Sequence, residues 1–113
     1  MIPFKRGLRM SVLKNILIEE KERLERNIRS YEEILSKLPK GNLIFRKIRN
    51  HFFVYRNVRL KHQIKTTYIG KKGSTKVVEQ ILLRKEYLRI KRNLHVANEE
   101  YKKLSRALRV YER

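Results

Sequence analysis

The sequence predicts an α+β fold in which two long helices form an antiparallel coiled-coil hairpin with a small antiparallel three-stranded sheet inserted between them. Three observations predict it: heptad spacing of apolar residues towards both ends, a middle segment rich in β-branched and aromatic residues, and Pro and Gly at the borders. A chain of 113 residues is long enough for one domain. We therefore predict a basic N-terminal tail over residues 1–10 and a single domain over residues 11–113.

The first predicted helix covers residues 11–38. Its apolar residues follow one another at spacings of seven, four and three, and form a single stripe of Leu17, Leu24, Ile28, Tyr31, Leu35 and Leu38. Pro39 and Gly41 predict the end of this helix, because Pro cannot continue a helix and Gly favours its C-terminal boundary. Met10 opens directly into the pattern, and we expect it as an alternative translation start.

The middle segment, residues 42–70, is predicted to be a meander of three strands. Its runs "LIFRKI", "FFVYRNVR" and "IKTTYIG" are rich in Ile, Val, Phe, Tyr and Thr. Asn50 and His51 separate the first two runs, and the residues around Lys61 separate the second and third. Alternation along the second run predicts an inward face of Phe52, Val54, Val58 and Leu60, interrupted by Arg56, and an outward face of Phe53, Tyr55, Asn57 and Arg59. We expect Phe52 and Phe53 to serve the core rather than binding.

The second predicted helix covers residues 75–112, with Ser74 or Thr75 as its N-cap. Its stripe alternates spacings of four and three without a break, through Leu83, Tyr87, Ile90, Leu94, Ala97, Tyr101, Leu104, Leu108 and Tyr111. The two stripes have compatible phase for antiparallel pairing within one chain. They also permit a homodimer.

Positive charge is concentrated in the strand segment. The formal net charge is +19, and the segment from Ile34 to Val78 contains twelve Lys or Arg residues and no acidic residue. Like charges repel, so packing alone gives no reason to remove every carboxylate, whereas phosphate neutralisation does. Candidate nucleic-acid-binding residues are Arg46, Lys47, Arg49, Tyr55, Arg56, Arg59, Lys61, Lys65, Tyr68, Lys71 and Lys72.

The residue types in this segment fit DNA and RNA equally well. Lys and Arg neutralise phosphates, Arg also reads base edges, and Tyr stacks on exposed bases. A second feature is the "GKKGST" stretch, which leads into a helix start. It is either an ordinary N-cap after a glycine turn or a phosphate site at a helix N-terminus, and the sequence leaves both readings open.

This chain has few of the side chains that enzymes use for catalysis. It has no Cys and no Asp, and all eleven acidic residues are Glu within the two predicted helices. His51, His62 and His95 are isolated and do not have metal-ligand spacing. We therefore expect no enzyme activity, no metal and no other cofactor. No apolar run reaches the ~18 residues of a membrane span, and the helices are too rich in Glu and their apolar stripe too narrow for binding to a membrane surface. We therefore expect no membrane partner, and the absence of Cys fits the cytoplasm.

The segments "LPKGNL", "FFVYR" and "KTTYIGK" carry a family resemblance. The chain resembles short proteins of Firmicutes genomes and their mobile elements, in which an L-P-K-G turn and a Tyr-rich hairpin ending near Y-I-G-K lie between two coiled-coil helices. The sharpest matches are Leu38, Pro39, Lys40 and Gly41, followed by Tyr68, Ile69, Gly70 and Lys71. The resemblance implies the same architecture.

Together these features predict a non-enzymatic nucleic-acid-binding protein that uses the acid-free meander at the end of a helical hairpin. The alternative is a small phage or mobile-element protein that binds and inhibits a nucleic-acid-processing enzyme, such as a CRISPR effector or a nuclease. In that case the partner is a protein or a protein–nucleic-acid complex rather than free nucleic acid.

Overall fold

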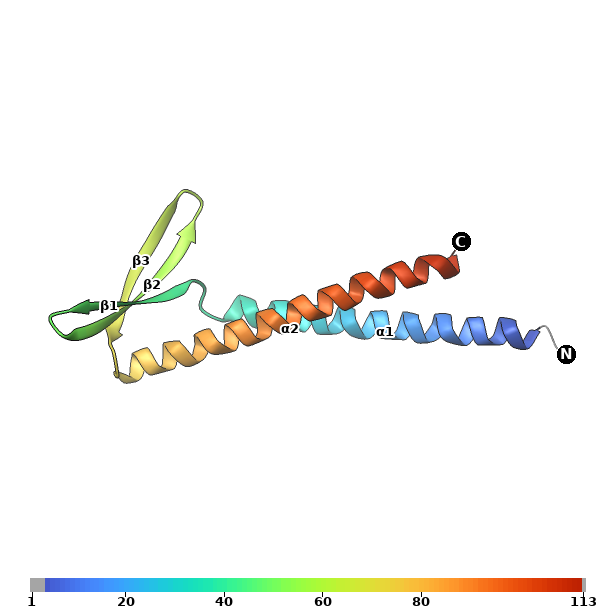
Figure 1. The fold of residues 1–113 in the computed structure, drawn as a ribbon, viewed down its shortest axis with the longest axis horizontal. Helices are drawn as coiled ribbons and strands as arrows, with labels where there is room; N and C mark the ends of the chain where they lie inside the picture. Colours follow the sequence, from blue (N-terminus) through green and yellow to red (C-terminus); the bar gives the residue numbers. More distant parts are fainter. Residues whose placement is uncertain (1–3, 113) are drawn as a thin grey trace. The chain divides into compact units, whose positions relative to one another are not determined.

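A computed structural model describes the backbone of residues 4–112 and the side chains of residues 11–111. The elements follow in the order α1 (Phe4–Lys37), β1 (Asn42–Ile48), β2 (His51–Leu60), β3 (Gln63–Lys71) and α2 (Thr75–Glu112) (Figure 1). This confirms the α+β class, with two helices and one three-stranded antiparallel sheet.

The chain divides into two compact units. We call the described part of Met1–Glu33 together with Lys91–Arg113 the helical unit, and Ile34–Ile90 the sheet unit. The single domain expected from chain length stays a prediction.

The helix boundaries agree with the sequence at three of four ends. α2 has the predicted limits, and α1 ends at Lys37, immediately before the predicted Leu38. The start of α1 was predicted wrongly: the helix begins at Phe4, so residues 4–10 continue the helix and are not a separate tail. Residues 1–3 of that predicted tail lie outside the described residues.

The predicted apolar stripes are confirmed as the less exposed sides of both helices. Every stripe residue from Leu17 to Tyr111 is buried or half-buried. In the helical unit, Tyr101 Oη donates a hydrogen bond of 3.1 Å to Glu25 Oε1, and Lys21 Nζ lies 5.4 Å from the centroid of the Tyr101 ring. These contacts join α1 to α2.

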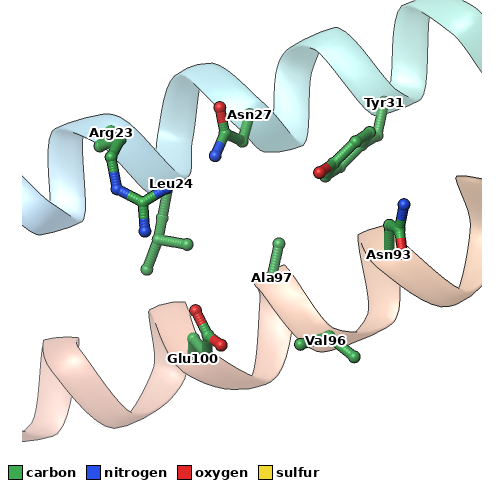
Figure 2. A pocket seen from close by; sticks show the side chains of 8 residues that line it. All are labelled: Arg23, Leu24, Asn27, Tyr31, Asn93, Val96, Ala97 and Glu100. Carbon is green, nitrogen blue, oxygen red and sulfur yellow. The ribbon is translucent and has the colours of Figure 1, made fainter.

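A hollow of about 220 Å³ interrupts this packing. Figure 2 shows Asn27 and Tyr31 of α1 directed towards Asn93 and Ala97 of α2. Ala97 is buried but ends in a single methyl group, so it leaves space that a larger apolar side chain would fill. The helical unit is therefore less tightly packed here than a protein interior.

The β1–β2 hairpin has a two-residue turn. Ile48 pairs with His51, and Arg49 and Asn50 between them have φ angles of 49° and 66°. Two consecutive positive φ values are typical of the type I′ turn, whose twist matches that of the flanking strands. The turn thus lies one residue earlier than predicted, and His51 is the first residue of β2.

The core of the sheet unit consists of Val54, Ile69 and Val77, with Leu43 and Ile81 packed against it. Val54 and Val77 are 0% exposed, and burying each such side chain contributes about 1.5–3 kcal/mol. The first turns of α2 therefore cover one face of the sheet through Val77 and Ile81.

A β-bulge in β3 brings Ile69 into this core. Val54 pairs with Gly70 and Tyr55 with Tyr68, so Ile69 has no residue opposite it. A Cβ atom on Gly70 would lie 3.2 Å from Val77 Cγ2, which is tighter than ordinary contact. The Y-I-G order thus places Tyr68 outward and Ile69 inward, and Gly70 gives α2 room to approach.

Candidate nucleic-acid interface

The pairing register divides the sheet into two faces. The core face carries Leu43, Val54 and Ile69 and lies against α2. We call the other side the open face. By strand alternation and register, it carries Asn42, Ile44, Arg46, Ile48, His51, Phe53, Tyr55, Asn57, Arg59, Ile64, Thr66, Tyr68 and Lys71.

Three rings gather at the centre of the open face, and we call Phe53, Tyr55 and Tyr68 the aromatic group. The ring centroids of Tyr55 and Tyr68 lie 5.4 Å apart at an interplanar angle of 87°, an edge-to-face contact. Those of Phe53 and Tyr68 lie 6.3 Å apart at 43°. Tyr68 is 47% exposed, and the other two are half-buried. The group therefore offers ring surface to a ligand.

Cations border the aromatic group on both edges of the sheet. Phe53 pairs with Arg46 on β1 and with Lys71 on β3, so one row across the open face reads cation, ring, cation. The Arg46 guanidinium carbon lies 5.1 Å from the centroid of the Tyr55 ring, a cation–π contact.

The next residues along the open face are polar. Thr66 Oγ1 donates a hydrogen bond of 2.7 Å to Asn57 Oδ1 across strands β2 and β3. Beyond this pair, Arg59 pairs with the exposed Ile64. The face thus combines stacking surface, hydrogen-bonding groups and positive charge without a carboxylate.

The predicted site residues do not form one surface. Arg46, Tyr55, Arg59, Tyr68 and Lys71 lie on the open face. By the same alternation, Lys47, Arg56 and Lys65 lie on the core face, and Arg49, Lys61 and Lys72 lie in turns. Within the described residues, none of these nine cations forms an ion pair with a glutamate.

Arg56 and Lys47 have neighbours that differ from those of the open face. Arg56 is half-buried and, with Gln80 and Arg84, lines a cavity of about 10 Å³, roughly the space of one water molecule. Lys47 Nζ lies 6.0 Å from the Phe52 ring centroid, and Lys72 Nζ lies 4.9 Å from it. The Phe52 ring is thus already in contact with cations of the chain itself.

The glycine turn before α2 leads into Ser74, which is the N-cap of this helix. Ser74 Oγ accepts a hydrogen bond of 3.4 Å from the Val77 N–H, and Gly73 has a φ angle of +91°. This confirms Ser74 as the cap that the sequence proposed together with Thr75. A phosphate site at the same turn stays a prediction.

The sequence reading did not assign Phe53, Asn57 or Thr66 to the site. Alternation along the second run placed Phe53 outward with Tyr55, and its half-buried ring does lie on the open face beside Tyr68. Phe53 was left out of the predicted site because both phenylalanines were expected to serve the core rather than binding. The meeting of Asn57 with Thr66 depends on the β2–β3 register, which the sequence did not determine.

Glutamates on the helices pair with cations of the same helix. Arg23 hydrogen-bonds to Glu20, and Arg89 to Glu86. These side-chain hydrogen bonds from arginine lower the pKa of both carboxyl groups below the usual 4.5. The contrast with the sheet is clear, because its cations have no carboxylate on their own strands.

The described residues contain no cluster of three or more His, Cys, Asp or Glu side chains that could hold a metal ion. In the same part of the chain, neither helix has an apolar stretch long enough to cross a membrane. Comparison of the chain with protein-family models, with curated proteins and with solved structures finds no match. The residues of the sheet are therefore the basis on which a function is inferred.

Proposed function

We propose that this chain is a non-enzymatic nucleic-acid-binding protein and that the open face of its sheet is the binding surface. The observation that carries the proposal is the three-stranded sheet without an acidic residue, whose cations flank exposed rings. A polyanion offsets the repulsion among these cations and releases its own counterions on binding. The proposal covers both DNA and RNA.

The cations suited to this role number five. Arg46, Arg59 and Lys71 lie on the open face, and Arg49 and Lys61 lie in turns at the ends of its strands. Lys72 is left out because its ammonium lies against the Phe52 ring on the core face. If each of the five neutralises one phosphate, log K should fall with log salt at a slope of about −4.5 on duplex DNA. Affinity should then fall roughly 500-fold between ~50 and ~200 mM salt.

A salt titration by fluorescence anisotropy tests the proposal. The first variant carries Arg46→Gln, Arg59→Gln and Lys71→Gln, and should lose about three units of slope. The matched control carries the same loss of charge on exposed positions of α2, through Arg92→Gln, Lys103→Gln and Arg106→Gln. Equal effects of the two triple variants, or affinity that does not change with salt, would refute the open face as the binding surface.

The second candidate function is inhibition of a nucleic-acid-processing enzyme, by a phage or mobile-element protein that occupies the substrate channel of a CRISPR effector or nuclease. The acid-free sheet supports it where the enzyme presents an acidic surface or carries a bound nucleic acid, because the cations of the sheet are attracted to carboxylates and phosphates alike. Pull-down from host lysate after treatment with DNase and RNase separates the two candidates. A protein partner that survives both nucleases favours inhibition, and loss of all partners favours nucleic-acid binding.

For the helical unit, we propose that α1 and α2 pair as an antiparallel coiled-coil hairpin within one chain. The shared stripe and the contact of Tyr101 with Glu25 and Lys21 support this pairing. A homodimer through the same stripe is the alternative, and light scattering at several concentrations distinguishes them. We place the protein in the cytoplasm, where nucleic acid is accessible to it.

A further inference from the structure

We propose that the open face binds single-stranded nucleic acid, with unpaired bases stacked on the aromatic group of Phe53, Tyr55 and Tyr68. This inference rests on the proposed function and names its ligand class. It starts from the exposure of Tyr68, which is 47% exposed although its ring contacts both other rings of the group. Base–aromatic stacking is the main sequence-tolerant interaction of single-strand binders.

The spacing between successive rows of side chains on the open face favours an extended strand of nucleic acid. Residues on one face of a strand recur every second position, so neighbouring rows lie about 6.8 Å apart. Bases stacked in a duplex strand lie about 3.4 Å apart, too close for one base per row. In an extended single strand the bases no longer stack on one another, so one base can lie against Phe53 and the next against Tyr55 and Tyr68.

The flanking groups suit the backbone and edges of such a strand. Arg46 and Lys71 pair with Phe53 from either side, so both sheet edges at this row offer a cation to a phosphate. Next to the rings, the hydrogen-bonded pair of Asn57 and Thr66 offers polar groups to a base edge. In single strands these edges are exposed, whereas in a duplex they are partly paired.

A duplex or a second copy of the chain fits this face poorly. The ring faces of paired bases are covered by their neighbours in a duplex, so Phe53 and Tyr68 would meet no stacking partner there. A second copy would bring Arg46, Arg59 and Lys71 against identical cations, with no carboxylate on either sheet to offset them.

The test compares ligands and variants by fluorescence anisotropy at one salt concentration. The ligands are oligo-U and oligo-dT, a duplex, and an abasic oligonucleotide, all with the same number of phosphates. Tyr68→Leu should weaken binding of both single strands about 5- to 150-fold, the effect of removing one stacked base, and should leave the abasic ligand unchanged. Tyr68→Phe keeps the ring and should bind within about threefold of the parent.

Phe52→Leu is the matched control. Phe52 is the neighbour of Phe53 on the opposite face, is 38% exposed and already contacts Lys47 and Lys72. This variant should bind single strands as the parent does. Far-UV circular dichroism and the urea midpoint show that each variant is folded, and the parent's ratio of oligo-dT to abasic affinity tests the inference without any variant.

Three outcomes overturn the inference. Equal affinity for the duplex and the single strands, with Tyr68→Leu unchanged, refutes base stacking and leaves the proposed function intact. Equal affinity for oligo-dT and its abasic counterpart does the same. Absence of binding to every nucleic acid refutes the inference and the proposed function together.

Discussion

Replacement of Gly41 by Ala tests how the chain enters the sheet from α1. Gly41 has a φ angle of +95°, which residues with a Cβ atom rarely adopt. A Cβ atom at this position would lie 2.2 Å from the carbonyl oxygen of Asn57 and 2.9 Å from Val58 Cγ2. Both neighbours belong to β2, and Asn57 pairs with Asn42, the first residue of β1. Gly41→Ala must therefore move β1 away from β2.

The cost has two parts. Holding a non-Gly residue at this φ costs about 1–3 kcal/mol. The collision with backbone atoms adds a cost of the order seen for overpacked sites, about 1–3 kcal/mol. The sum, about 2–6 kcal/mol, is a large share of the ~5–15 kcal/mol that stabilises a typical domain.

Gly73→Ala separates these two parts. Gly73 has nearly the same φ, +91°, but a Cβ atom there would meet no atom within 4 Å. Gly73→Ala should therefore lower the free energy of unfolding only by the conformational part, about 1–3 kcal/mol. Urea unfolding followed by far-UV circular dichroism measures both variants, and amide hydrogen exchange on β1 shows where protection is lost. Equal destabilisation by the two replacements would refute the steric argument.

Three further predictions concern single residues. Arg49→Asn should stabilise the hairpin by about 1 kcal/mol in urea unfolding, because Asn tolerates the positive φ of this turn better than Arg does. The same variant should lower the salt slope of nucleic-acid binding by about 0.7–0.9, because it removes one cation. A destabilised variant contradicts the turn assignment. Ser74→Ala should cost about 0.5–2 kcal/mol in the same assay by removing the cap on the Val77 N–H, whereas Ser74→Gly should cost only a few tenths; equal losses argue against a side-chain cap. The hydrogen bond from Arg23 lowers the Glu20 pKa, so its contribution to stability is present above pH ~4.5 and is lost as the pH falls through the lower folded-state value. NMR titration of Glu20 should show its midpoint rising in Arg23→Gln, and an unchanged midpoint would argue against this cause.

Local patterns in the sequence were sufficient for the element types and for most boundaries. The heptad stripes of α1 and α2, the strand runs and the Ser74 cap depend on residues close together in the chain, and each was predicted correctly. The start of α1 was missed because residues 4–9 carry neither a cap signal nor the heptad stripe. Such a segment has no strong local preference that could be read from sequence.

The site depended on pairing between strands, which local patterns do not specify. Alternation along β2 places Phe53 and Tyr55 on one face, but only the bulge at Ile69 brings Tyr68 to that face opposite Tyr55. The same register places Arg56 on the core face beside Gln80. The sequence by itself determined that the sheet is cationic and free of carboxylates, because the residue types of a segment do not depend on how it folds. Which cations and rings share a surface was decided only by the tertiary structure, because a shift of one residue in register moves every side chain to the other face.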